Sequence, residues 1–231
     1  MKAMILAAGR GERLQPLTDH TPKPLVPVAG KAVIAHTLER LAVLGFRQVV
    51  INAHHLADKL MDQVGDGSTW GVEIIWSREE GLMNTGGGVR QALPLLGEEP
   101  FLAVNGDIMW DLDLRGLLDR FDPEKMDALL GLVANPFHHG GDFTLMDDQG
   151  TLKRTPGGAG SRTYSGVQIV HPKAVAAFPL EPFSLNRLYD QALGAGRLFG
   201  LALEGCWADM GAPDRLLEAR RMWGEPDPSL G

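Results

Sequence analysis

A glycine-rich turn with an arginine follows the first apolar stretch of the chain. Gly9 and Gly11 leave the backbone free to approach a ligand closely and to expose its N–H groups. Arg13 adds a planar fork of hydrogen-bond donors. Because the turn comes at the carboxyl end of a predicted strand, this combination favours a cradle for an anion. An ordinary strand-to-helix turn is the alternative.

Lys23 favours the anion site over the ordinary turn. Pro22 and Pro24 flank it, so the backbone is stiff and the lysine is presented at low entropic cost. Two well-known phosphate loops are excluded, since a P-loop needs G-x-x-x-x-G-K-[ST] and a dinucleotide loop needs glycine where this chain has Leu14. The second predicted strand continues as "VVINAHH" without an acidic residue at its end, which argues against an NAD-dependent oxidoreductase.

The elements around this turn alternate between strand-like and helix-like patterns. Strands are predicted at 4–7, 48–52, 72–76 and 101–105, and helices at 32–44, 56–64, 88–96 and 114–121. The alternation predicts an α/β fold, a single-domain Rossmann-like α/β/α sandwich with a mostly parallel central sheet. After Asp127, glycine and proline clusters with a hairpin turn at 147–151 predict a β-rich lobe over one end of the sheet. A strand at 198–205 is expected between helices at 185–195 and 213–223.

Composition narrows the expected partners to small molecules. The chain has 231 residues and a formal net charge of −7 with no run of Lys or Arg, so we expect neither a nucleic-acid nor a membrane partner. The apolar segment at 3–9 is too short for a bilayer span or a secretory signal. Cys206, the one cysteine, excludes an intrachain disulfide and favours a cytoplasmic setting; we expect it in the core. We expect a monomer or a small homo-oligomer.

Residues 9–25, "GRGERLQPLTDHTPKPL", resemble the signature of the sugar-1-phosphate nucleotidyltransferases, which make nucleotide sugars from a nucleoside triphosphate and a sugar 1-phosphate. The segment "VNGD" at 104–107 is similar to the strand-end metal aspartate of that family. "WADMGAPDRLLEA" at 207–219 is similar to its second metal aspartate and closing helix. The resemblance implies one domain over 1–231, with a nucleotide-binding half at about 1–105 and a sugar-binding half at about 106–223.

The same resemblance implies a set of site residues. Arg13, Lys23 and Asp107 would be catalytic, and Asp107 and Asp209 would share Mg²⁺. The residues implied to bind the nucleotide are Leu6, Ala8, Gly9, Gly11, Glu12, Arg13, Lys23, Glu79, Asn84, Thr85 and Gly86. Carboxylate oxygens suit Mg²⁺, which offsets the roughly six negative charges of the two substrates. The alternative for each aspartate is a helix N-cap.

The segment "SREEGLMNTGGG" at 77–88 stands where the family recognises its base. Its small residues would let backbone N–H and C=O groups read the edge of the base. A carboxylate at Glu79 would accept the N3–H of uracil and repel the N3 lone pair of cytosine, so UTP is favoured, with dTTP as the nearest rival. The alternative is that Glu79 is an exposed acidic residue of a loop.

"YSGVQI" at 164–169 resembles the strand beneath the sugar in the family. The implied sugar-binding residues are Asn105, Gly141, Arg154, Tyr164 and Gly166. Residues 153–156, "KRTP", depart from the acidic residue and lysine that commonly precede this proline, and their cations would suit an acidic sugar. Together with the "TGGG" stretch at 85–88, these cations resemble the branch of the family that transfers a uridylyl group to N-acetylmuramate 1-phosphate in peptidoglycan recycling. The alternatives are a surface role for Arg154, a hexose 1-phosphate thymidylyl-, uridylyl- or guanylyltransferase, and a non-catalytic nucleotide-sugar sensor.

Overall fold

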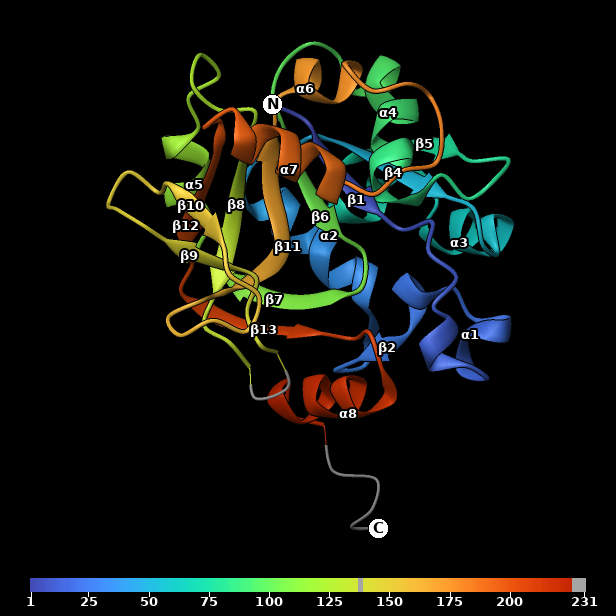
Figure 1. Cartoon of the computed structure of the whole chain (residues 1–231). Coiled ribbons are helices and arrows are strands. Elements are labelled where there is room, and N and C mark those ends of the chain that lie inside the picture. The colour runs from blue at the N-terminus through green and yellow to red at the C-terminus, as the bar shows by residue number, and fades with distance from the viewer. Residues whose placement is uncertain (137–138, 226–231) are drawn as a thin grey trace.

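A seven-stranded sheet forms the centre of the molecule in the computed structural model, which describes residues 1–136 and 139–225 (Figure 1). The strands follow the order β12-β8-β11-β6-β1-β4-β5. Their bounds are Ala3–Leu6 for β1, Gln48–Ala53 for β4, Glu73–Arg78 for β5, Phe101–Asn105 for β6, Ala128–Val133 for β8, Thr163–Val170 for β11 and Leu198–Ala202 for β12. Within this sheet β11 runs antiparallel to β6 and β8, whereas the other adjacent strands are parallel. The predicted α/β fold with a mostly parallel sheet is confirmed.

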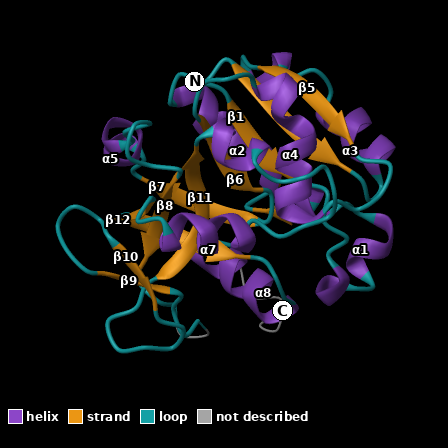
Figure 2. Ribbon diagram, turned by 45° about the horizontal axis from the view of Figure 1, so that its top comes forward, coloured by secondary structure: helices purple, strands orange, loops and turns teal. Residues whose placement is uncertain are grey.

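Helices cover both faces of the sheet, which is why its central strands are apolar on both sides. In β1, Ile5 belongs to one hydrophobic core and Met4 to the other, and both are fully buried. The first core contains side chains of α2 (Val33–Val43), α3 (Ala57–Val64) and the turn into α5 (Arg115–Arg120). The second contains side chains of α4 (Asn84–Leu96), α6 (Pro172–Ala176) and α7 (Asn186–Gly194), and Figure 2 shows α4 and α7 in front of the sheet.

The helix α2 shows how local sequence produces these elements. Val33, Thr37, Leu38 and Leu41 recur at steps of three and four residues and are buried along one stripe. Gly45 follows with a φ of 90°, a left-handed conformation that ends the helix at little steric cost. The predicted helix at 32–44 is therefore confirmed to within one residue at each end.

Three two-stranded ribbons extend beyond the central sheet. They pair β2 (Pro27–Val28) with β3 (Lys31–Ala32), β7 (Ile108–Leu112) with β13 (Gly205–Asp209), and β9 (Phe143–Leu145) with β10 (Leu152–Arg154). The β9–β10 hairpin turns close to Gly150, as the glycine in "DDQGT" predicts. The ribbon β7–β13 packs on α8 (Pro213–Met222) through Met109, Ala208 and Leu216, at the lower edge of Figure 1.

Two expectations from the sequence are wrong in detail. The helix expected to begin at 88 begins at Asn84, because the three glycines before Val89 are themselves helical. Cys206 is exposed instead of buried, because it lies on the open face of the β7–β13 ribbon opposite exposed Asp111, whereas the next residue, Trp207, is buried. In the described part of the chain, no helix is both long and apolar enough to cross a bilayer.

Candidate active site

The carboxyl ends of β6, β1 and β4 meet at one edge of the sheet. Leu6, the last residue of β1, pairs with Asn105 on one side and Asn52 on the other. Because β4 and β6 flank β1 on opposite sides, this edge is a topological switch point, where α/β sheets bind ligands. A cavity of about 240 Å³ opens there. Its lining residues are Leu6, Ala7, Ala8, Gly9, Lys23, Pro24, Asn52, Leu82, Asn84, Thr85, Asn105, Gly106 and Asp107.

Part of the predicted site lines this cavity. The predicted residues among its lining are Leu6, Ala8, Gly9, Lys23, Asn84, Thr85, Asn105 and Asp107. Asn52 is a lining residue that the sequence analysis missed. Like Asn105, it is a polar residue near the carboxyl end of an apolar strand, and that position is the sequence signal that could have identified it.

Two glycines in the turn after β1 have different structural roles. A Cβ at Gly9 would have no neighbour within 4 Å, so this part of the backbone is open to a ligand. Gly11 has a φ of 68°, and a Cβ there would lie 2.8 Å from the side chain of Thr18 in α1 (Leu17–His20). The Thr18 hydroxyl donates to the Gly11 carbonyl at 2.9 Å, which closes the turn. Gly11 therefore shapes the loop and Gly9 leaves room beside it.

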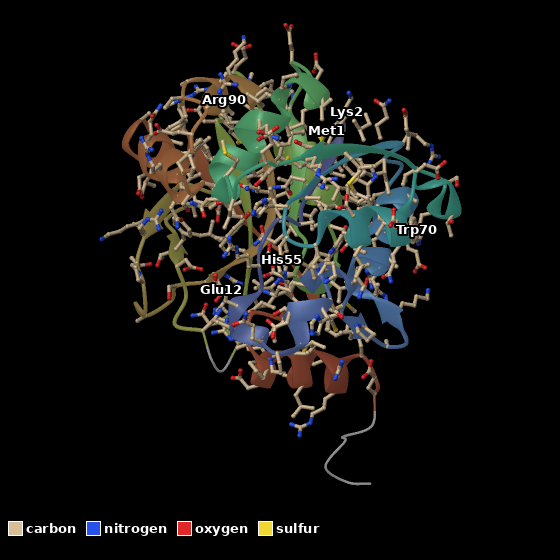
Figure 3. All side chains as sticks on the ribbon, turned by 90° about the vertical axis from the view of Figure 1, so that its right-hand side faces the viewer. Met1, Lys2, Glu12, His55, Trp70 and Arg90 are labelled. Atoms are coloured by element: carbon tan, nitrogen blue, oxygen red, sulfur yellow. The ribbon has the colours of Figure 1, made fainter. Side chains whose placement is uncertain are left out.

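Glu12 follows this turn but does not line the cavity. It borders a separate polar hollow together with Arg10, Gln15 and His55, as the labelled positions of Glu12 and His55 in Figure 3 help to locate. Within the described residues, the structure thus places Glu12 outside the cavity that Gly9 and Lys23 line.

Lys23 and Asp107 form an ion pair at the cavity wall. Lys23 is buried, in a short 3₁₀ turn (Lys23–Leu25), and its Nζ donates to Asp107 Oδ2. The side chain of Asp107 is 35% exposed, so the pair is buried on the lysine side and open on the aspartate side. A strand, β7, follows Asp107 directly, and the alternative of a helix cap for this residue is therefore wrong.

Asp209, the last residue of β13, pairs with Ile108, the residue after Asp107. The two aspartates therefore lie at neighbouring ends of the β7–β13 ribbon. Met210 N–H donates to the Asp107 carbonyl at 2.9 Å and holds the two ends together. Asp209 is not the cap of α8 either, because Ala212 occupies that position. The ribbon β7–β13 is thus what brings two residues 102 positions apart in the sequence to one place.

The Asp209 carboxylate has several donors around it. Gly211 N–H lies at 2.7 Å, His139 Nε2 at 2.5 Å, and Arg215 Nη1 at 2.8 and 3.1 Å from its two oxygens. Burial opposes ionisation, but these hydrogen bonds outweigh it and hold the pKa of Asp209 below its ordinary value. His139 and Arg215 are site neighbours that sequence patterns did not indicate.

Arg13 completes the cluster on the same side. A Cβ at Gly211 would lie 2.8 Å from Arg13 Nη2 and 2.7 Å from Asp209 Oδ1, so the guanidinium and the carboxylate flank the same glycine. Lys23 and Asp107 line the cavity, whereas Arg13 and Asp209 lie beside it. The structure thereby brings together the four charged residues that the sequence analysis singled out.

The donor chemistry of this cluster fits Mg²⁺ bound together with substrate. Within residues 1–136 and 139–225, no three His, Cys, Asp or Glu side chains gather as a ready-made cage for a metal ion. Asp107 and Asp209 offer two hard carboxylates, each balanced by a neighbouring cation. Mg²⁺ commonly takes one or two carboxylates and completes its octahedron with water and phosphate oxygens.

The opposite wall is the start of α4, whose glycines pack closely against neighbouring segments. A Cβ at Gly86 would lie 2.3 Å from the Phe183 ring. Gly86 N–H and Gly87 N–H both donate to the Phe183 carbonyl, at 2.8 and 3.1 Å. Among the described residues, Asn84 and Thr85 line the cavity and Gly86 does not, so the contact of Gly86 with the nucleotide stays a prediction.

Glu79 is directed into the protein. Its carboxylate accepts hydrogen bonds from Asn52 Nδ2 at 2.7 Å and from Met83 N–H at 3.0 Å, and the residue is 3% exposed. Among the described residues it is not part of the cavity lining. The alternative of an exposed loop residue is wrong, because Glu79 is buried. The contact with uracil stays a prediction, and the two hydrogen bonds that the carboxylate already accepts do not favour it.

The residues implied to bind the sugar divide into two groups. Gly166 has a φ of 81°, and a Cβ there would lie 2.9 Å from the side-chain amide of Asn105, so this glycine lets β11 pack against the cavity residue. Gly141 lies in a tight turn away from the cavity, where a Cβ would lie 2.2 Å from Ser161 Oγ. Neither Tyr164 nor Arg154 is among the described residues that line the cavity.

Tyr164 and Arg154 belong to a half-buried polar cluster between β10, β11 and α7. The Tyr164 ring meets Tyr189 edge to face at 5.8 Å, and burial raises the pKa of Tyr189 to about 12, so its hydroxyl stays a neutral donor. The Arg154 guanidinium stacks on Phe143 at 4.9 Å. Arg154 Nη2 pairs with Asp190 Oδ1 at 2.9 Å, and in the described part of the molecule its Nε has no partner in hydrogen-bonding geometry. Unsatisfied buried donors of this kind are suited to a polar ligand.

Several known proteins are similar to this chain over more than nine-tenths of its length. The family model described as nucleotidyl transferase matches residues 2–147. The chain is 45% identical to the N-acetylmuramate alpha-1-phosphate uridylyltransferase of Neisseria meningitidis serogroup B, over 97% of this chain and 99% of the relative. It is 36% identical to the protein of the same name from Caulobacter vibrioides, over 96% and 97% of the two chains. It is 30% identical to a mannose-1-phosphate guanylyltransferase of Mycobacterium tuberculosis, over 92% of this chain and 61% of the relative.

A solved structure shares the fold. A Bacillus anthracis protein, assigned as a glucose-1-phosphate thymidylyltransferase and crystallised with sucrose, superposes with a TM-score of 0.85 at 20% sequence identity. The match covers 96% of this chain and 95% of the other. At this identity the likeness concerns the fold alone.

Proposed function

Because the chain belongs to the nucleotidyl transferase family, we propose that it transfers a uridylyl group from UTP to N-acetylmuramate 1-phosphate and releases pyrophosphate. The observation that carries the proposal is the convergence of Arg13, Lys23, Asp107 and Asp209 at the switch point of the sheet. The two relatives at 45% and 36% identity, both N-acetylmuramate alpha-1-phosphate uridylyltransferases, support this pair of substrates.

The reaction needs neither a protein base nor a covalent nucleophile, because the attacking group is already an anionic phosphate oxygen. In-line attack of the sugar phosphate on the α-phosphorus of UTP forms one P–O bond as the bond to pyrophosphate breaks. Lys23 and Arg13 would hold the triphosphate, with the loop from Gly9 to Arg13 around it. Positioning and charge stabilisation supply the acceleration in such a site.

Asp107 and Asp209 would hold Mg²⁺, which when bound supplies the positive charge that two phosphate anions need in order to meet. Lys23 and Arg215 balance these carboxylates in the protein itself. The low pKa of Asp209 keeps it ionised, as a metal ligand must be.

We infer that the base lies against the start of α4, where Leu82, Asn84 and Thr85 line the cavity. Asn84 and Thr85 supply the polar atoms of this wall. Since Glu79 is buried, the preference for UTP over CTP rests on the two uridylyltransferase relatives and not on a carboxylate at the base.

An assay of turnover tests the proposal directly. The protein with Mg²⁺ is given UTP, dTTP, CTP or GTP together with N-acetylmuramate 1-phosphate, N-acetylglucosamine 1-phosphate or mannose 1-phosphate, and pyrophosphate release is followed. We expect the highest kcat/KM for UTP with N-acetylmuramate 1-phosphate. Turnover with another pair would assign the chain to another branch of the family, and binding without turnover would favour the sensor.

The acceptor's lactyl carboxylate would pair with Arg154. This guanidinium is partly buried, stacks on Phe143 and pairs through Nη2 with exposed Asp190 Oδ1 at 2.9 Å, and its buried Nε has no partner among the described residues. Lys153, the other cation of the pair predicted from the sequence, is exposed on the opposite side of the β10 strand. The structure therefore favours one of the two cations as the carboxylate partner.

Arg154→Ala is expected to raise the KM for N-acetylmuramate 1-phosphate by about tenfold to a hundredfold, since a hydrogen bond to a charged group contributes about 1.5–3 kcal/mol. The KM for UTP should not change. Lys153→Ala is the matched control and should leave both constants near wild type. Equal KM values for the acceptor in wild type and Arg154→Ala would exclude the pairing.

We further infer that the protein is a cytoplasmic enzyme of peptidoglycan recycling. Its proposed substrates support this placement, because UTP is a cytoplasmic metabolite and N-acetylmuramate is a cell-wall sugar. The single cysteine is consistent with a reducing compartment.

A further inference from the structure

Two buried polar residues, Asn52 and Glu79, connect the opposite walls of the nucleotide cavity. One wall is the chain after β1, at Ala7 to Gly9, and the other is the segment from Leu82 to Thr85 that begins α4. Asn52 is 2% exposed and Glu79 is 3% exposed. Their side chains therefore lie in the protein and not in solvent.

A continuous chain of hydrogen bonds runs between the walls. Ala7 N–H donates to Asn52 Oδ1 at 2.8 Å, Asn52 Nδ2 donates to Glu79 Oε1 at 2.7 Å, and Met83 N–H donates to Glu79 Oε2 at 3.0 Å. Gly88 leaves space for this chain, since a Cβ there would lie 2.6 Å from both Asn52 Nδ2 and Glu79 Oε1. The first wall, two side chains and the second wall are thus in direct contact.

The polarity of this chain of bonds is determined by its ends. Both ends are backbone N–H groups, which only donate. A chain with a donor at each end needs one member that accepts on both sides, and a carboxylate does so while an amide does not. Asn52 accepts from Ala7 and donates onward, so Glu79 must be the double acceptor.

We propose that Asn52 and Glu79 are positioning residues that set the spacing of the two walls and thereby the affinity for the nucleoside triphosphate. The inference rests on the proposed function, because it takes the cavity to be the UTP site. It assigns to Glu79 a role at a distance from the base. Neither residue needs to take part in the chemical step.

Reversing the polarity provides a sharp test. In Glu79→Gln, the new amide must face either Asn52 Nδ2 or Met83 N–H, donor against donor. In Asn52→Asp, two carboxylate oxygens face each other where 2.7 Å now separates donor and acceptor. In the double variant Asn52→Asp/Glu79→Gln, the new carboxylate at position 52 accepts from Ala7 N–H and from the new amide at position 79, whose oxygen accepts from Met83 N–H. Every bond is restored with the opposite polarity and the same net charge.

We expect each single variant to raise the Kd for UTP by about 5- to 100-fold, from the cost of a buried unpaired polar group. The double variant should return to within about threefold of wild type. The KM for the acceptor should change little in all three. Titration calorimetry with UTP, steady-state kinetics and thermal melts measure these quantities on the full chain.

Thr37→Val is the control for a merely structural effect. It removes the buried bond from Trp110 Nε1 to Thr37 Oγ1, 3.3 Å long, away from the cavity lining. It should lower the melting temperature without changing UTP affinity. Unchanged UTP affinity in both single variants, or a double variant as weak as the two single effects combined, would overturn the inference. Absence of nucleotide binding by the wild type would instead refute the proposed function on which it rests.

Discussion

Asp107→Asn is expected to lower kcat by at least about a thousandfold, the equivalent of roughly 4 kcal/mol of transition-state stabilisation. The substitution keeps the shape of the side chain and removes its charge. The amide oxygen can still accept from Lys23, so the fold should remain intact. The loss of activity would arise because the negative charges of the two substrates are no longer offset.

The physical reason is the repulsion between the substrates. Two like charges about 4 Å apart repel by roughly 4 kcal/mol at an effective dielectric near 20, and UTP and the sugar phosphate carry several. Lys23 and Arg13 alone do not balance them. Asp107 and Asp209 together would hold the additional divalent charge, so Asp209→Asn and excess EDTA should each have the same effect as Asp107→Asn.

Pyrophosphate release at saturating substrates measures the effect, with far-UV circular dichroism to confirm the fold. Asp111→Asn is the matched control, because Asp111 lies on β7, the strand that follows Asp107, is 65% exposed and pairs with Arg40 at the surface. It should retain wild-type turnover. Full activity of Asp107→Asn, or of the wild type in excess chelator, would contradict the metal role.

Lys23→Met should lower kcat/KM for UTP by about a hundredfold to a thousandfold, the range for loss of a preorganised charge partner of the reacting phosphates. Lys23 is buried between two prolines, so its side chain is already ordered before substrate binds. Methionine preserves the apolar stem and deletes the ammonium group. The side chain of Asp107 is 35% exposed and can be solvated when its partner is lost, so stability should change less than activity.

Lys31→Met serves as the control for loss of one positive charge. Lys31 is exposed and pairs with Glu39 at 2.7 Å on the surface, away from the cavity lining. Its replacement should leave kcat/KM within about twofold of wild type, because exposed ion pairs contribute little. If Lys23→Met behaved like Lys31→Met, Lys23 would be a structural partner of Asp107 and not a ligand of the triphosphate.

The sequence by itself determined the class of fold and the end of the sheet at which to look. Apolar runs alternating with amphipathic stripes predict a parallel sheet from local patterns alone, and the turn from Gly9 to Lys23 carries its glycines and cations within one short segment. These features depend on neighbours in the chain. Interactions between residues close in the sequence are enough to specify these features, and for this reason the predicted α/β fold was confirmed.

The tertiary structure alone decided which side chains face the cavity and which face one another. Lys23 and Asp107 are 84 positions apart, and Asn52 and Glu79 are 27 apart, so no local pattern reports their pairing. Glu79 and Gly86 have residue types suited to a base, yet packing against Asn52 and Phe183 uses their polar groups inside the protein. The direction of a side chain depends on strand register and on the elements packed over it, and both are set by contacts distant in sequence.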